Sequence, residues 1–163
     1  MKEERIKNLV RTWRGKSHNE GDQFASFVFI WFCFNAWLEF LASHDADNDR
    51  KMLEELKSTS ANMSSLLGAY NTAHASDEFF RRSLQGLINK SKEETIKDVR
   101  GQRQPISISD ENDFANIVEA IYRIRCNLFH GGKDANDTRD QVLVKDAAMI
   151  LRQWIGKLID SWK

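Results

Sequence analysis

Apolar residues recur along most of this chain with the spacing of amphipathic α-helices. In residues 3–14 they stand at i, i+3, i+4 and i+7, and Gly15 predicts the end of that helix. Residues 19–42 are apolar nearly all round, which is typical of a helix at the centre of a fold or shared with a second subunit. Shorter patterns predict helices over residues 47–57, 63–74 and 79–89.

Two more helical patterns fill the C-terminal third. One spans residues 110–129, and the double glycine at 131–132 predicts its end. The last helix is expected to begin at residues 136–138. Its predicted core face consists of Val144, Ala147, Ala148, Leu151, Ile155, Leu158 and Trp162. Residues 101–109 read as a loop whose end, from Pro105, forms a brief extended piece.

These patterns predict an all-α fold. The 163 residues contain one proline and eight glycines, so there are few helix breakers. A chain of this length suits one domain with one hydrophobic core. We therefore expect residues 1–163 to form a single-domain helical bundle with long central helices.

The overall charge gives no sign of a nucleic-acid partner. Lys plus Arg and Asp plus Glu both number 24, so the net charge is zero, whereas phosphate-binding proteins usually carry an excess of basic residues. Residues 81–103 hold seven basic and three acidic residues, a local surplus of four. This run and the acidic run at 45–55 are each interpreted as solvated faces.

Further classes are excluded by what the sequence lacks. There is no CxxC or HExxH pattern, so we expect no metal and no cofactor. Cys33 and Cys126 lie in apolar runs, which favours reduced thiols and a cytoplasmic location. Residues 27–41 are too short to span a bilayer and include Asn35 and Glu39, so no membrane association is expected.

The most informative segment is residues 124–133. Arg125 occupies a position where the helical period asks for an apolar side chain, and His130 follows at the predicted helix end. A guanidinium in such a place is costly unless it is paired or faces a wet cleft. Five helical steps turn a side chain by about 140°. Arg125 and His130 therefore converge only if the helix ends near Phe129, or if two copies of the motif meet in a dimer.

The string Arg125-Cys-Asn-Leu-Phe-His130-Gly-Gly-Lys resembles the Arg-x4-6-His motif of the HEPN superfamily (higher eukaryotes and prokaryotes nucleotide-binding domains). The aromatic segment Phe29–Trp37 also resembles a helix of such proteins. The resemblance implies a helical bundle that is usually dimeric, with two motifs facing each other. Many members are metal-independent endoribonucleases, often toxins or defence effectors. Others bind RNA, a nucleotide or a partner protein without catalysis.

Carried over by this resemblance, Arg125 and His130 are the catalytic pair. The family commonly has a polar residue directly after the arginine, where this chain has Cys126, so Asn127 is the candidate for that supporting role. Lys133 and Asn35 are candidates for RNA binding, although a solvated lysine and a satisfied core asparagine are alternative interpretations. The expected partners are RNA, a second copy of the chain and an antitoxin or regulatory protein.

The chemistry of an Arg/His pair suits RNA cleavage without a metal. A histidine exchanges protons close to neutral pH and can take the proton of the 2′-hydroxyl or protonate the leaving 5′ oxygen. An arginine can stabilise the charge that develops on the phosphate. The products would be a 2′,3′-cyclic phosphate and a 5′-hydroxyl, and DNA would be inert. Two alternatives remain: a noncatalytic binding module, and a helical scaffold without a site.

Overall fold

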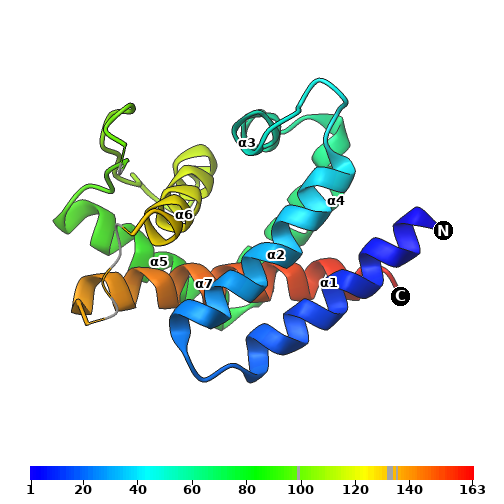
Figure 1. Cartoon of the computed structure of the whole chain (residues 1–163), viewed down its shortest axis with the longest axis horizontal. Helices are drawn as coiled ribbons and strands as arrows, with labels where there is room; N and C mark the ends of the chain where they lie inside the picture. Colours follow the sequence, from blue (N-terminus) through cyan, green and yellow to red (C-terminus); the bar gives the residue numbers. More distant parts are fainter. Residues whose placement is uncertain (99, 132–133, 135) are drawn as a thin grey trace.

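The computed structural model describes residues 1–98, 100–131, 134 and 136–163, and within these ranges it is built of helices (Figure 1). The all-α prediction is confirmed. The elements in chain order are α1 (Lys2–Asn19), α2 (Gln23–Leu41), α3 (Asp49–Lys57), the 3-10 turn η1 (Ala61–Met63), α4 (Ser64–Ser76), α5 (Glu78–Glu93), α6 (Phe114–Phe129) and α7 (Thr138–Asp160).

Helix α2 lies at the centre, packed against both α1 and α7 (Figure 1). It begins where the Asp22 carboxylate accepts hydrogen bonds from the backbone N–H groups of Phe24 and Ala25. Its aromatic residues form much of the core, and the Phe34 ring lies 5.1 Å from that of Trp154 on α7. By length and composition α2 also resembles a membrane span, a property that buried core helices share.

Helix α7 runs the length of the molecule and contacts α1, α2, α4, α5 and α6 (Figure 1). The predicted core face from Val144 to Leu158 is buried, while Trp162 is half-buried against the core. Both termini lie at the same end of the molecule, where the Arg11 guanidinium stands 5.2 Å from the Trp162 ring. The sequence pattern therefore identified the stripe that holds the bundle together.

Four helix boundaries differ from the predictions by four residues or more. Helix α2 begins at Gln23 rather than at residue 19, and α5 ends at Glu93 rather than at residue 89. Helix α1 continues through Gly15 to Asn19, because this glycine has an ordinary helical φ and the last turn is anchored by Ser17, whose hydroxyl donates to Ser26 O at 2.8 Å. Helix α6 begins at Phe114 rather than near residue 110. There the Asp113 carboxylate accepts a hydrogen bond from Ser109 N at 3.0 Å, which folds the polar run into a turn.

The segment between α5 and α6, residues 94–113, folds back on itself beside α6 (Figure 1). Ile96 and Ile106 pair through two backbone hydrogen bonds of 2.8 and 3.1 Å. The Ser91 hydroxyl at the end of α5 accepts a third bond from Ile108 N. The expected loop with a brief extended piece is confirmed, and its two ends are tied together at the base.

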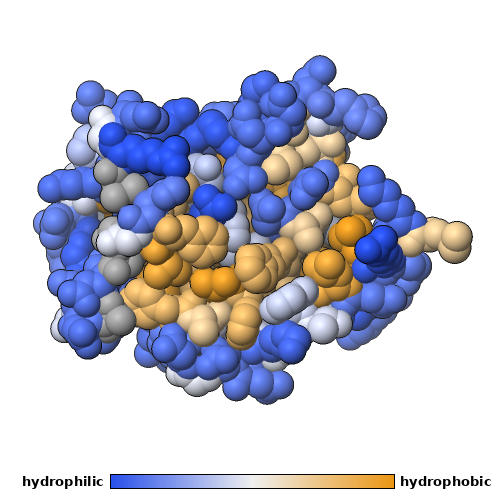
Figure 2. Space-filling model, viewed as in Figure 1, coloured by the Kyte–Doolittle hydropathy of each residue, from blue (hydrophilic) through white to orange (hydrophobic). Residues whose placement is uncertain are grey.

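One face of the molecule carries an apolar band. Figure 2 shows apolar surface gathered over the middle of the face that α2 crosses. Phe32 of α2 and Phe129 at the end of α6 are each 41% exposed. Exposed aromatic side chains of this size, next to partly exposed apolar neighbours, are typical of a surface that contacts another molecule.

Candidate functional site: an arginine-lined cleft at the end of α6

The end of α6 brings Arg125 and His130 to one cleft of about 210 Å³. The helix stops at Phe129, His130 leaves the helical conformation with φ −99° and ψ 16°, and Gly131 follows with φ +74°. Glycine adopts such a positive φ without the strain that a Cβ would cause. Because the helix ends here, the two side chains reach the same hollow within one chain.

The cleft is lined mainly by basic side chains. Its lining consists of Arg50, Asp98, Arg100, Gln102, Arg103, Tyr122, Arg125, Cys126 and His130. These residues come from α3, from the 94–113 loop and from α6. Four guanidiniums and one carboxylate line the cleft. Two of the guanidiniums also pair with carboxylates outside the lining, Arg125 with Asp49 and Arg50 with Glu119, so a small local excess of positive charge favours an anion although the chain as a whole is neutral. Arginine is also the side chain whose planar fork of donors fits phosphate oxygens best.

Arg125 is held by rings and by one acidic partner. Its guanidinium carbon lies 4.6 Å from the Phe129 ring, with Trp31 and Tyr122 at 5.7 and 5.9 Å. Nη2 pairs with Asp49 Oδ2 at 3.3 Å, and the side chain keeps 22% of its surface exposed. Among the described residues its contacts do not include the carbonyls of α6. The guanidinium is therefore presented to the cleft instead of capping its own helix.

His130 is exposed and contacts the loop. Its Nε2 atom lies 2.8 Å from Nη2 of Arg100. A guanidinium has donors only, so this contact requires the imidazole Nε2 to act as acceptor. The loop thus brings a second arginine directly against the histidine of the motif.

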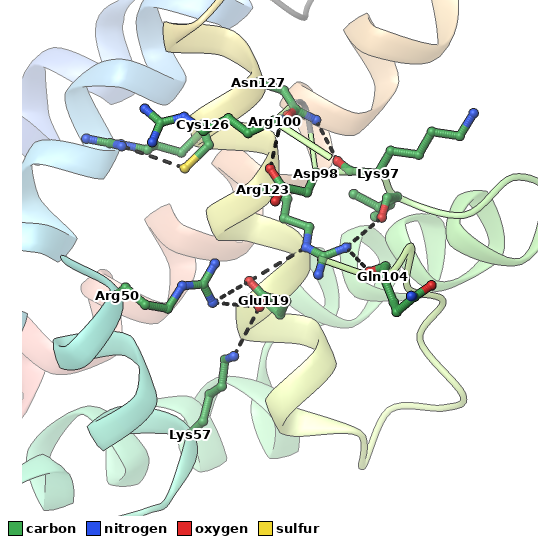
Figure 3. Close-up of polar contacts among 12 residues, drawn as sticks. Arg50, Lys57, Lys97, Asp98, Arg100, Gln104, Glu119, Arg123, Cys126 and Asn127 are labelled. Carbon is green, nitrogen blue, oxygen red and sulfur yellow. Dashed lines mark hydrogen bonds and ion pairs between the residues drawn. The ribbon is translucent and has the colours of Figure 1, made fainter. Parts of the chain in front are cut away.

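Arg50 is fixed in the cleft wall by a buried carboxylate. The two carboxylate oxygens of Glu119 on α6 accept hydrogen bonds from Arg50 Nη1 at 2.6 and 3.0 Å. Lys57 Nζ donates to Oε1 of the same carboxylate at 3.3 Å (Figure 3). Burial by itself raises the pKa of Glu119, but the hydrogen bond from Arg50 and the charges of Lys57 and Arg50 outweigh it and lower that pKa. The Arg50 guanidinium also lies 4.7 Å from the Tyr122 ring.

The turn of α6 that follows Glu119 fastens the loop (Figure 3). Buried Arg123 donates through Nη1 to Gln104 O at 2.6 Å and to Ile96 O at 3.0 Å. Asn127, also buried, donates to Lys97 O at 3.1 Å. These bonds hold both strands of the loop, so Arg100 and Arg103 reach the cleft from a fixed base.

Of the other predicted residues, the two that the structure describes, Asn127 and Asn35, do not line the cleft. Asn127 faces a separate hollow with Lys97 and Arg139, where its amide binds the loop backbone. Asn35 lies on α2 with its buried Oδ1 lacking a hydrogen-bond partner in the described part of the chain. Lys133 lies outside the described residues. The sequence therefore identified the pair at the centre of the cleft but not the residues around it.

Tyr122 and Cys126 lie beside Arg125 in the floor of the cleft. Burial, followed by the nearby Cys126 and Asp49, raises the pKa of Tyr122 to about 12. The phenol therefore stays protonated at neutral pH and is unsuited to act as a base there. Arg125 Nη1 approaches the Cys126 sulfur at 3.7 Å. No group of three or more metal-ligating side chains occurs among the residues that the structure describes.

Sequence reasoning missed Arg50, Arg100 and Arg103 as cleft residues. Arg100 and Arg103 belong to the basic run at 81–103, and Arg50 to the acidic run at 45–55, both of which were interpreted as solvated faces. The Glu119/Arg123 pair, four residues apart and both within an apolar stripe, was the available signal for a buried ionic cluster.

Comparison of the chain with protein-family models, with curated proteins and with solved structures finds no match. The function is therefore argued from the residues and the geometry of the cleft.

Proposed function

We propose that this protein is a HEPN-type, metal-independent endoribonuclease. The observation that supports this most directly is that Arg125 and His130 line one cleft together with three further arginines. The likeness of residues 124–133 to the HEPN motif supplies the reaction class, and the all-helical fold is compatible with it. The cleft then supplies what the neutral net charge of the chain does not, namely a local site for phosphate.

In this proposal the substrate phosphate binds between the guanidiniums of the cleft. The 2′-hydroxyl attacks the neighbouring phosphorus, and His130 takes up its proton or gives one to the leaving 5′ oxygen. Arg125 stabilises the negative charge that builds up on the phosphate oxygens, a role whose removal typically costs about 10²–10³ in rate. The rings around Arg125 restrict its rotamers, so less entropy is lost when it binds.

A second candidate is a noncatalytic module that binds RNA, a nucleotide or a partner protein. The pairing of Arg125 with Asp49 favours it, because an anion must displace this carboxylate before both guanidinium edges are free. In that case the cleft would hold a phosphate group without cutting beside it.

We further propose that the protein acts as a homodimer in the cytoplasm. Apolar surface lies beside the cleft, because exposed Phe129 contacts Arg125, and Phe32 of α2 is exposed to the same extent. A second copy packed on this surface would bring two clefts near each other. A role as a toxin or defence effector, with an antitoxin or regulatory partner, belongs to the same proposal.

The test is cleavage of labelled RNA by purified protein in EDTA. The nuclease proposal predicts cutting by the wild type and loss of cutting in both Arg125→Ala and His130→Ala. An exposed arginine outside the cleft, replaced in Arg82→Ala, serves as the matched control. Retained RNA binding without any cutting by the wild type would instead support the binding module.

A further inference from the structure

The contact between His130 and Arg100 defines which ring nitrogen carries the proton. Nη2 of Arg100 lies 2.8 Å from Nε2 of His130, and a guanidinium only donates. Nε2 must therefore offer its lone pair, which leaves the ring proton on Nδ1. We propose that Arg100 is a further catalytic residue. It holds His130 in this tautomer, and its guanidinium then exchanges the hydrogen bond to Nε2 for hydrogen bonds to the substrate phosphate. This inference rests on the proposed nuclease function.

The tautomer assigns a direction to the proton transfer. With a lone pair on Nε2, His130 acts as the general base. The proton of the 2′-hydroxyl passes to Nε2, the bond between O2′ and phosphorus forms, and the bond between phosphorus and O5′ breaks. The leaving 5′ oxygen takes a proton from water, and the imidazolium afterwards returns its proton to the hydroxide that remains.

Arg100 has a better partner once RNA is bound. A bidentate bond between guanidinium and phosphate is charge-assisted and stronger than a bond to a neutral ring nitrogen. The incoming phosphate therefore draws Arg100 away from Nε2, which frees that atom for the 2′-hydroxyl. In the free protein the same arginine covers the lone pair, so the base becomes available only with substrate in the cleft.

The backbone of Arg100 is placed for such a change of partner. Its N–H donates to the Asp98 carboxylate at 3.0 Å. Burial by itself raises the pKa of Asp98, but hydrogen bonds from the backbone of Arg100 and Gln102 outweigh it and lower that pKa. The loop is further bonded to Arg123 and Asn127 on α6. The exposed Arg100 side chain can therefore swing while its backbone stays beside the cleft.

The ring nitrogens of His130 report this contact directly by nitrogen NMR, with the signals assigned through His130→Ala. The free wild type should show the proton on Nδ1, and Arg100→Ala should shift the ring toward the tautomer with the proton on Nε2. Arg100→Lys should keep the wild-type tautomer, because an ammonium also only donates. Addition of a 2′-O-methylated RNA oligonucleotide to the wild type should break the contact and change the Nε2 signal.

Cleavage rates complete the test. Arg100→Ala should lower kcat by a factor of about 10². The kcat of Arg100→Lys should lie between those of Arg100→Ala and the wild type, and the kcat of Arg82→Ala should equal that of the wild type. A wild-type His130 with its proton on Nε2, or a tautomer or kcat unchanged in Arg100→Ala, would overturn this inference and leave the nuclease proposal intact. A wild type that cuts no RNA would overturn the nuclease proposal, and with it the catalytic role of Arg100, whatever the tautomer.

Discussion

The buried carboxylate of Glu119 lies 2.6 Å from Nη1 of the partly exposed Arg50, and this ion pair joins α6 to the cleft wall on α3. Lys57 approaches the same carboxylate at 3.3 Å and Arg123 at 3.8 Å. Removing one member of a buried ion pair leaves the remaining charges without compensation. Glu119 is therefore the residue on which the positions of both Arg50 and the loop depend.

Glu119→Gln should destabilise the fold by about 2–4 kcal/mol at pH 7 in urea unfolding. The folded state lowers the pKa of Glu119, so its stabilising effect is present above the ordinary carboxyl pKa and is lost as the pH falls through the folded value. Glu119→Gln cannot ionise at this position, so its free energy of unfolding should fall less than that of the wild type as the pH is lowered.

Lys57→Met is the matched control for Glu119→Gln, because Lys57 contacts the same carboxylate and does not line the cleft. It should cost less than Glu119→Gln, about 1 kcal/mol, because Glu119 keeps its ion pairs with Arg50 and Arg123 when Lys57 is removed. Equal stability of Glu119→Gln and wild type at pH 7 would show that the cluster contributes nothing to the fold.

Asp49→Asn should tighten RNA binding. The Asp49 carboxylate competes with phosphate for Nη2 of Arg125, across 3.3 Å. A partly exposed ion pair is worth about 0.2–1 kcal/mol, so its removal should lower the Kd for RNA by up to about fivefold at low salt. Fluorescence anisotropy measures this, with the exposed Asp47→Asn as control. Weaker binding in Asp49→Asn would mean that Asp49 orients Arg125 for the ligand.

Asp146→Asn should stabilise the protein above pH 6. Burial raises the pKa of Asp146 from 3.8 to about 6, and the charges of Lys145 and Lys90 only partly oppose it. Below pH 3.8 the group is protonated in both states, so its cost to folding grows as the pH rises to about 6 and is then constant. A pKa shift of this size corresponds to a gain in unfolding free energy of at most about 3 kcal/mol for Asp146→Asn. We expect a gain of about 1–2 kcal/mol because the residue is half-buried.

Urea unfolding of the wild type and Asp146→Asn at pH 4 and pH 7 measures this difference. The two should be closer in stability at pH 4 than at pH 7. A second substitution checks the packing: a Cβ at Gly86 would lie 2.5 Å from Asp146 Oδ2. Gly86→Ala should therefore be destabilising in the wild type and better tolerated beside Asp146→Ala. A gap between wild type and Asp146→Asn that does not change with pH would contradict the raised pKa.

The sequence predicted the helices because their apolar stripes are long and regular. It also predicted that Arg125 and His130 converge if the helix ends near Phe129, which is where α6 ends. The boundary at Gly15 was wrong, because a glycine with helical φ does not by itself end a helix. No local pattern predicts that Arg50 and Arg100, distant in sequence, meet α6 at one cleft. That arrangement depends on the tertiary bonds made by Glu119 and Arg123.

The central claim is that the 2′-hydroxyl of RNA attacks its own phosphate in the cleft of Arg125 and His130. The most direct measurement uses oligonucleotides in which all riboses but one are 2′-O-methylated, incubated with the protein in EDTA. The account predicts a single cut, directly after the unmodified ribose, with 2′,3′-cyclic phosphate and 5′-hydroxyl ends. It also predicts that this cut disappears in Arg125→Ala and in His130→Ala. Cuts after methylated riboses, 3′-hydroxyl ends, or cutting that survives either substitution would contradict it.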